Sequence, residues 1–316
     1  MQDLVKEASE QQWTSPLPGI LGKMIASSMV PFPDTYWGNR LKNLEEELPH
    51  WRRPIERLRT NDSLRTLALA LDRINDQIIA PDPDNLFRAY SELAMKNVNV
   101  VFLGQDPYPS SDRSCQTLEL FNSMSHEEVS KIIGSGYADN ALTKSIPWLS
   151  ESTKTRPHVQ LKAIPYAIGK SFAYPKECIE PPGSYVNLQK CLIASVGKKI
   201  QMDPELKNWS SQGVLMLNAC PHLYNKSSKN PNVWTAWTSE ILGSITKTRP
   251  FCVFVLLGNS AKSFKADIVE ANSAACIIET GHPSLRNSNV GDFLNCDVFR
   301  RINDFRTSLE LPAIQW

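Results

Sequence analysis

The sequence lacks the features that mark several large classes of protein. It has no apolar run of about 18 residues and no basic segment followed by an apolar one, so it predicts neither a membrane span nor a secretory signal. It also has no GxSxG, GxGxxG or P-loop pattern, which argues against an unrelated small-molecule α/β hydrolase. We therefore expect an intracellular protein, nuclear or cytoplasmic, that does not bind a membrane.

Cysteine is sparse, and its spacing does not suit a metal site. The seven cysteines never form a CxxC pair, which predicts reduced core thiols and neither zinc nor an iron–sulfur cluster. The 34 basic and 33 acidic residues leave a net charge of +1, which argues against a polybasic tail but allows a local basic face. No metal or organic cofactor is expected.

What the chain does contain is an alternation of two hydrophobic patterns. Four short apolar runs rich in β-branched residues end in a glycine or a polar residue, at 98–103, 214–217, 252–257 and 275–278. Stretches of helical periodicity separate these runs, at 186–196, 234–245 and 261–271. Such an alternation predicts an α/β fold, a single domain with a central, mainly parallel four-stranded sheet flanked by helices.

Two segments do not follow this alternation of strand and helix patterns. Residues 1–34, with several prolines among serine and glutamine, predict a weakly ordered N-terminal tail before a domain at 35–316. Residues 110–166 mix polar residues with amphipathic pieces and are interpreted as an inserted segment. The insertion is either a solvent-exposed elaboration or a contact for DNA or a protein partner.

Polar residues follow three of the predicted strands. The first strand is followed by Gln105, Asp106 and Tyr108, another by Asn218, and the last by His282. The carboxyl ends of parallel strands line the ligand crevice of an open sheet, so these side chains are expected to converge. Each of them alone also fits an ordinary turn, cap or structural role. The prediction of a site therefore depends on their joint placement.

Four segments, in this order along the chain, resemble the motifs of family 1 uracil-DNA glycosylases. They are 104–109 (GQDPYP), 167–172 (AIGKSF), 212–218 (QGVLMLN) and 281–284 (GHPS). The resemblance covers nearly everything except the tail and the insertion. It implies the fold of that family and a DNA repair enzyme that flips uracil out of DNA and hydrolyses its N-glycosidic bond, leaving an abasic site.

The resemblance implies a role for each matching residue. Asp106 would orient the attacking water and stabilise the oxocarbenium-like sugar, and neutral His282 would donate a hydrogen bond to uracil O2. Gln105, Tyr108, Phe172 and Asn218 would form the uracil-binding site. In that site the asparagine amide reads O4 and N3–H, the phenylalanine ring stacks on the base, and the tyrosine, held between two prolines, excludes a 5-methyl group.

The resemblance also implies contacts with the DNA backbone, and here the chain departs from the family. Ser184 and Ser284 lie in segments that resemble phosphate-binding loops. Residues 282–287 read HPSLRN where the family pattern is HPSPLS, so either Leu285 is displaced by one position or Arg286 occupies the minor-groove wedge position. This departure and the insertion leave a second interpretation open, a glycosylase-fold DNA-binding scaffold or replication accessory protein with weak or no catalysis.

Overall fold

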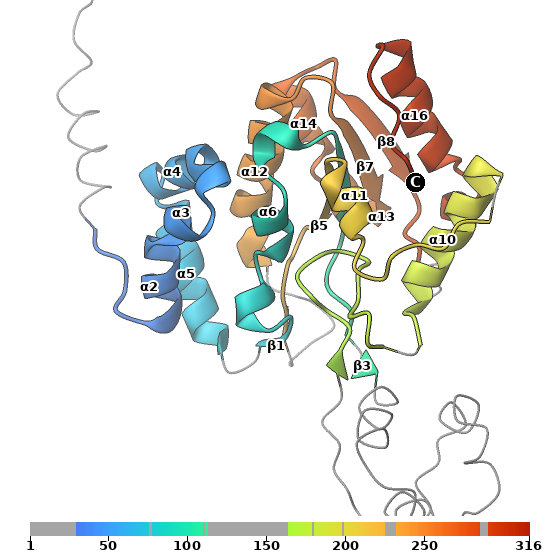
Figure 1. Ribbon diagram of the computed structural model, residues 1–316. Helices are drawn as coiled ribbons and strands as arrows, with labels where there is room; N and C mark the ends of the chain where they lie inside the picture. The colour runs from blue at the N-terminus through green and yellow to red at the C-terminus, as the bar shows by residue number, and fades with distance from the viewer. Residues whose placement is uncertain are drawn as a thin grey trace, which may run out of the picture.

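A central parallel sheet organises the molecule. The computed structural model describes residues 30–75, 78–109, 111–112, 164–178, 180–197, 199–224, 232–284 and 290–316. Its main sheet is four-stranded in the order β5-β2-β7-β8, and every neighbouring pair is parallel. The strands are β2 (Val100–Gly104), β5 (Val214–Asn218), β7 (Val253–Leu257) and β8 (Cys276–Thr280). Helices cover both faces (Figure 1). The predicted sheet is therefore confirmed.

Alternate residues of each strand enter two different cores. In β2, Val101 and Leu103 join one hydrophobic cluster, whereas Val100 and Phe102 join the other. Successive side chains of a strand point to opposite faces, so a sheet covered on both sides needs apolar residues at every position. This explains why the strands read as uninterrupted apolar runs.

The helices divide between these two cores. On the first face lie α2 (Tyr36–Lys42), α3 (Leu44–Glu47), α4 (Arg52–Thr60), α5 (Ser63–Ile74), α6 (Arg88–Glu92), α12 (Thr235–Thr248), α13 (Gly258–Lys262) and α14 (Lys265–Ala271). On the second face lie α10 (Gly183–Val196), α11 (Lys207–Ser211), α15 (Val290–Leu294) and α16 (Val298–Ser308). The short 3₁₀ helices are η2 (Pro49–Trp51), η4 (Pro83–Asn85), η5 (Met95–Asn97) and η7 (Asn232–Trp234). Within the described ranges, no helix is both long and apolar enough to cross a membrane.

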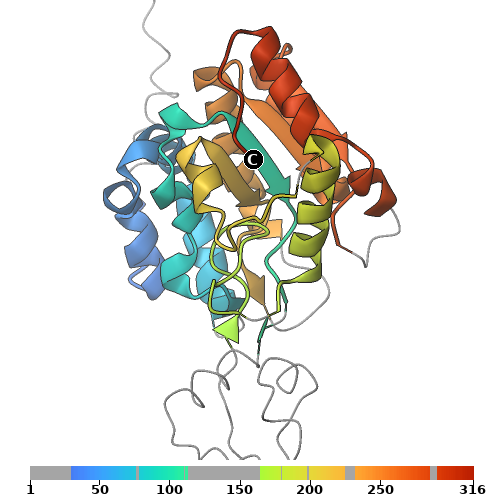
Figure 2. The same cartoon turned by 45° about the vertical axis from the view of Figure 1, so that its right-hand side comes forward.

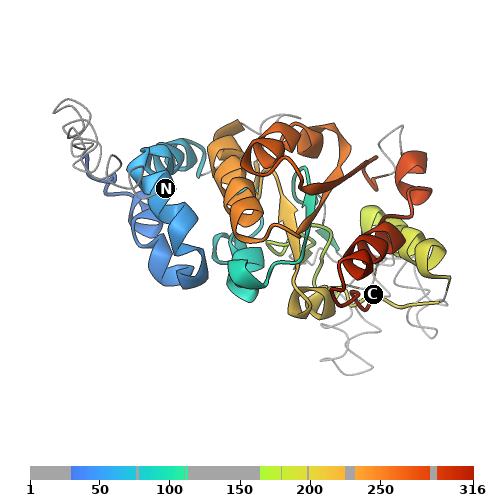
Figure 3. The same cartoon turned by 90° about the horizontal axis from the view of Figure 1, so that it is seen from above.

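Helices α2 to α5 pack as a group against α12, on one side of the sheet (Figure 3). Buried tryptophans join this group to the rest of the first core. The indole of Trp51 donates to the carbonyl oxygen of Tyr90 at 2.8 Å, and the indole of Trp237 donates to the Tyr90 hydroxyl at 2.9 Å. These bonds join α6, the helix that carries Tyr90, to η2 through Trp51 and to α12 through Trp237.

The C-terminal residues lie across the second face (Figure 2). The Trp316 ring packs edge-on against Phe102 of β2 and against Trp209 of α11. The backbone N–H of Gln315 donates to the side chain of Gln212 at 2.7 Å. The C-terminal segment therefore completes the second core.

Two small antiparallel ribbons complete the described structure. Strand β1 (Ile78–Ala80) pairs with β6 (Leu223–Tyr224), and β3 (Ser111–Asp112) pairs with β4 (Ile164–Pro165). The second ribbon brings the two ends of the 110–166 insertion together, directly after the GQDPYP segment. Most of the insertion, 113–163, and most of the N-terminal tail, 1–29, lie outside the described residues.

Candidate active site

The carboxyl ends of the four parallel strands meet at one edge of the sheet. Gly104 at the end of β2 is in register with Asn218 at the end of β5. The pairing continues past both strands, because the N–H of Cys220 donates to the carbonyl oxygen of Gln105 at 2.9 Å. Asp106 and Asn218 therefore leave neighbouring strands at the same level.

Gly104 permits the close approach of two predicted site residues. A Cβ at this position would lie 2.9 Å from Oδ1 of Asn218 and 3.1 Å from Cζ of the Phe172 ring. Real Cβ atoms almost never approach other heavy atoms below 3.0 Å, so a side chain here would displace the asparagine amide, and it would press tightly on the phenylalanine ring. The structure thus brings Asn218 and Phe172 together over the end of β2.

A second glycine brings the last strand's residue inward. His282 follows β8, which is separated from β2 by β7. Gly258, the residue that directly follows β7, has φ +80°, and a Cβ there would lie 3.1 Å from Cβ of His282. His282 consequently packs over the end of β7, and its ring centroid lies 5.6 Å from that of Phe172.

The Phe172 backbone ties the tyrosine to the same cluster. The hydroxyl of Tyr108 donates to the carbonyl oxygen of Phe172 at 3.0 Å, and the Tyr108 ring meets Tyr166 edge-on. Phe172 itself has φ +60°, a left-handed conformation that is rare for a bulky residue. Such strain persists only where surrounding contacts enforce it. Tyr108, Phe172, Asn218 and His282 therefore form one connected group.

Hydrogen bonding and burial fix the charge state of His282. The backbone N–H of Ser284 donates to Nδ1 at 3.1 Å, so Nδ1 is an acceptor and the ring proton lies on Nε2. Burial lowers the pKa of His282 to about 4. The side-chain amide of Asn187 in α10 donates through Nδ2 to the carbonyl oxygen of Pro283 at 2.8 Å. This bond holds the loop that carries His282. The site thus contains a neutral imidazole that can donate from Nε2.

Asp106, two residues after the end of β2, is the acidic member of the predicted set. Burial raises the pKa of its carboxyl group, and a hydrogen bond from the Gln105 side chain opposes that shift. A partly buried carboxylate interacts more strongly with positive charge than one in water. This arrangement suits stabilisation of a cationic intermediate.

Ser284 and Ser184 are the remaining predicted residues that lie within the described ranges. Ser284 is half-buried next to His282, and Ser184 is half-buried in the first turn of α10, the helix that holds Pro283. Leu285 and Arg286 lie outside the described residues. Sequence reasoning missed the supporting role of Asn187, for which an ordinary helix position gave no signal.

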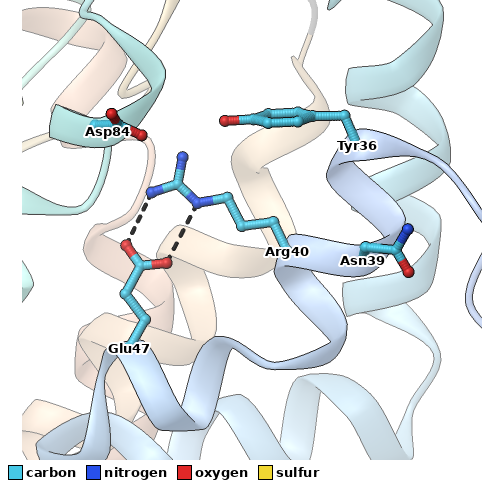
Figure 4. A pocket seen from close by; sticks show the side chains of 5 residues that line it. All are labelled: Tyr36, Asn39, Arg40, Glu47 and Asp84. Carbon is cyan, nitrogen blue, oxygen red and sulfur yellow. Dashed lines mark hydrogen bonds and ion pairs between the residues drawn. The ribbon is translucent and has the colours of Figure 1, made fainter.

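The structure also has a hollow on its N-terminal helices, and none of the candidate site residues lines it. It is lined by Tyr36, Asn39, Arg40, Glu47 and Asp84 (Figure 4). The Arg40 guanidinium binds both carboxylate oxygens of Glu47, at 2.8 and 3.2 Å, and donates to the carbonyl oxygen of Pro83 at 2.6 Å. These bonds join α2 and α3 to η4, a structural role. In the described part of the chain, no cluster of His, Cys, Asp and Glu could hold a metal ion.

The pKa of His282 leads to a prediction on stability. His222 and His282 both have a pKa of about 4 in the fold against 6.5 in the unfolded chain, because both are buried. Between these values the unfolded chain binds more protons, so stability is lost as the pH falls from 6.5 to 4. His282→Asn should reduce this loss, measured as the change in melting temperature between pH 7 and pH 5. An undiminished loss would show that His282 is protonated as readily in the folded as in the unfolded protein.

Comparisons with known proteins show the family to which the chain belongs. The family model described as the uracil DNA glycosylase superfamily matches residues 91–305. The uracil-DNA glycosylase of Glaesserella parasuis is 26% identical over 247 residues, 78% of this chain and 86% of the relative. That of Streptococcus uberis is 25% identical over 269 residues, 84% of this chain and 97% of the relative.

A solved structure shows the same fold. The crystal structure of mimivirus uracil-DNA glycosylase matches with a TM-score of 0.63 at 22% identity, covering 85% of this chain and 86% of that chain. The family match spans β2, β5, β7 and β8, whose ends carry the clustered side chains. Because the family model matches more than half of its length, the chain belongs to the uracil DNA glycosylase superfamily.

Proposed function

We propose that this protein is a uracil-DNA glycosylase, which flips uracil out of DNA and hydrolyses the bond between the base and the sugar. The observation that supports this most is the close approach of both Phe172 and Asn218 to Gly104, with His282 beside the phenylalanine ring. An aromatic face, an amide and a neutral imidazole donor are what a flipped pyrimidine needs for stacking, edge recognition and stabilisation of its developing charge.

The bond cleavage follows from two groups. As the N-glycosidic bond breaks, positive charge grows on the sugar and negative charge on the base. Asp106 stabilises the sugar cation, orients the water that attacks it and accepts the proton that this water loses. Nε2–H of His282 donates to uracil O2 as the bond to the sugar breaks, and the released uracil anion takes up a proton from water. The bond from the N–H of Ser284 to Nδ1 supports this role, because it keeps the proton on Nε2. The imidazole thus acts by hydrogen bonding without changing its protonation state.

Base selection rests on the remaining groups. The Asn218 amide offers a donor to O4 and an acceptor to N3–H, an order that uracil matches and cytosine does not. Phe172 provides the face on which the base stacks, a contact that contributes about 1–3 kcal/mol in single-stranded nucleic-acid sites. Gln105, which precedes Asp106 and hydrogen-bonds with it, completes the proposed uracil-binding set.

Tyr108 is proposed to reject thymine by occupying the space of its 5-methyl group. The hydroxyl bond to Phe172 and the flanking prolines hold its ring in one place. Tyr108→Ala is expected to narrow the preference for uracil over thymine by about 10- to 200-fold, the range for a single methyl group. Excision from oligonucleotides with one uracil or one thymine measures this.

A matched control separates the ring from its hydroxyl. Tyr108→Phe loses the bond to Phe172 but keeps the ring, so it should still reject thymine. If Tyr108→Ala also left thymine untouched, discrimination would have to lie in another residue.

DNA binding is proposed to use the loops around the cluster. Ser284 and Ser184 contact phosphates, with Ser184 at the N-terminal end of α10. Leu285 or Arg286 enters the minor groove. The tail at 1–34 lies outside the domain at 35–316, and the 110–166 insertion contacts a protein partner.

One excision assay tests the proposal. Single- and double-stranded oligonucleotides with one uracil are incubated with the protein and a metal chelator, and abasic sites are detected by alkaline cleavage. We expect excision from both substrates. The altered segment at 282–287 favours a second candidate, a glycosylase-fold DNA-binding scaffold or replication accessory protein with weak or no catalysis. Uracil-independent DNA binding with no abasic sites at high enzyme concentration would support the scaffold and refute the glycosylase.

A further inference from the structure

Lys170 is a buried cation within the segment that carries Phe172. Its side chain is 1% exposed, and its ammonium donates three hydrogen bonds: to Oε2 of Glu92 at 2.7 Å, to the carbonyl oxygen of Glu205 at 2.6 Å and to Oγ of Ser210 at 3.0 Å. An ammonium has three donors, and here all of them are used. A lysine is rarely buried this deeply unless its charge is compensated.

The partners of Lys170 belong to a wider charge network. Arg88 donates to Glu92 at 2.6 Å and to Glu205 at 2.8 Å, and Lys207 pairs with Glu205 at 2.8 Å. The network joins α6 and α11, which lie on opposite faces of the sheet. Lys170 therefore anchors its loop to two parts of the fold that are themselves fixed.

The backbone around Lys170 is held in an unusual path. Gly169 has φ +77°, and a Cβ there would lie 1.7 Å from the carbonyl oxygen of Asn85. Only glycine can therefore approach the backbone of Asn85 this closely. The N–H of Ser171 donates to the carbonyl oxygen of Met216 in β5 at 3.1 Å. The next residue is Phe172 with φ +60°. A left-handed backbone at an aromatic residue persists only where the surrounding contacts enforce it.

We propose that Lys170 is a positioning residue, whose three hydrogen bonds hold the strained loop so that the Phe172 ring lies over Gly104 beside Asn218. The inference rests on the proposed function, because the exact place of this ring matters to catalysis only if a base stacks on it. An apolar side chain could fill the same space, but it would form no hydrogen bonds that orient the loop. Burial lowers the pKa of Lys170, and Glu92 opposes that shift and favours the charged form.

The test is a double-mutant cycle between Lys170 and Phe172, read out as single-turnover uracil excision. Phe172→Ala should lower the rate about 5- to 150-fold, the equivalent of one base stacking contact. Lys170→Met keeps the length of the side chain and removes its donors, and it should lower the rate by up to that factor. The double variant should be no slower than Phe172→Ala alone. The enzyme concentration that gives half of the maximal single-turnover rate should change less than threefold, because phosphate contacts remain.

Two further variants control the cycle. Lys207→Met removes another cation from Glu205, but its side chain is 58% exposed, so the excision rate should not change. Ser210→Ala removes one of the three acceptors, and it replaces Lys170→Met in the cycle if that variant does not melt cooperatively. It should slow excision less than Lys170→Met and again add nothing to Phe172→Ala.

The outcomes separate the two proposals. If the wild type excises uracil and the effects of Lys170→Met and Phe172→Ala multiply, or if folded Lys170→Met is as fast as the wild type, Lys170 does not act through Phe172. The glycosylase activity would stand in both cases. A wild type that releases no uracil would instead refute the glycosylase function and, with it, the role of Lys170 in positioning a stacking ring.

Discussion

Asp106→Asn is expected to slow uracil excision by about 10²- to 10⁴-fold, the range for a positioned catalytic group. The change removes the negative charge next to the sugar but keeps the shape of the side chain. Affinity for uracil-containing DNA should change little, because the charge acts only as the sugar becomes cationic. Single-turnover excision and fluorescence anisotropy of a labelled oligonucleotide measure the two quantities separately.

Asp304→Asn is the matched control for this variant. Asp304 is an exposed residue of α16, so the control changes the net charge by the same amount away from the strand ends. It should leave the rate unchanged. An Asp106→Asn rate within threefold of the wild type would remove Asp106 from the mechanism, whatever its position at the end of β2.

The pKa of Asp106 also predicts the direction in which the pH profile of the excision rate is shifted. Burial raises the pKa of its carboxyl group, so the acid limb of the wild-type rate profile should lie above the ordinary pKa of an aspartate. His282 has a pKa of about 4 and is neutral above that pH. A fall in rate that begins above pH 4 is therefore not caused by protonation of His282. The two groups therefore suit a working range in which the acid is ionised and the imidazole is neutral.

The sequence predicted the sheet well because its strands are buried on both faces. Residues such as Val100 to Leu103 must be apolar at every position, and this pattern is visible without any knowledge of partners. The parallel order then brings the residues after each strand to one edge, so the position of Asn218 beside the end of β2 could be foreseen.

Short pairings were not predictable in the same way. Strand β1 has three residues and pairs with the two residues of β6, which are more than 140 positions away. Neither segment has the length at which alternation becomes a signal. The β3–β4 ribbon at the ends of the insertion is equally short. Such elements depend on tertiary contacts that local sequence does not contain.

Supporting contacts were also beyond the sequence. That Nδ1 of His282 accepts a hydrogen bond follows from the turn at Ser284, and the approach of His282 over β7 follows from the left-handed backbone at Gly258. A lysine in the AIGKSF segment reads as a surface residue, whereas Lys170 is buried because Glu92 and Glu205 reach it from distant segments. Residue types could suggest the site, but the contacts that orient it required the fold.

Asn218→Asp is expected to have the largest effect on specificity. The wild-type amide donates to O4 and accepts from N3–H of uracil, whereas cytosine presents a donor at N4 and an acceptor at N3. A site that hydrogen-bonds its substrate can reject the wrong pattern by about 10⁴- to 10⁵-fold. The variant should lose most of the preference for uracil, because the new carboxyl group can accept from N4 and, when protonated, donate to N3.

The protonation requirement gives this prediction a second readout. Cytosine excision by Asn218→Asp should increase as the pH is lowered, since only the protonated carboxyl group can donate to N3. Asn99→Asp, near the opposite end of β2, keeps the acceptor that Arg249 binds at 3.0 Å and loses the donor to the carbonyl oxygen of Gln212 at 2.9 Å, and it should leave base preference unchanged. Rates on oligonucleotides with one uracil or one cytosine measure both effects. If Asn218→Asp retained full selectivity for uracil, another group would read the edge of the base. The placement of Asn218 and Phe172 at Gly104 would then have only a packing role.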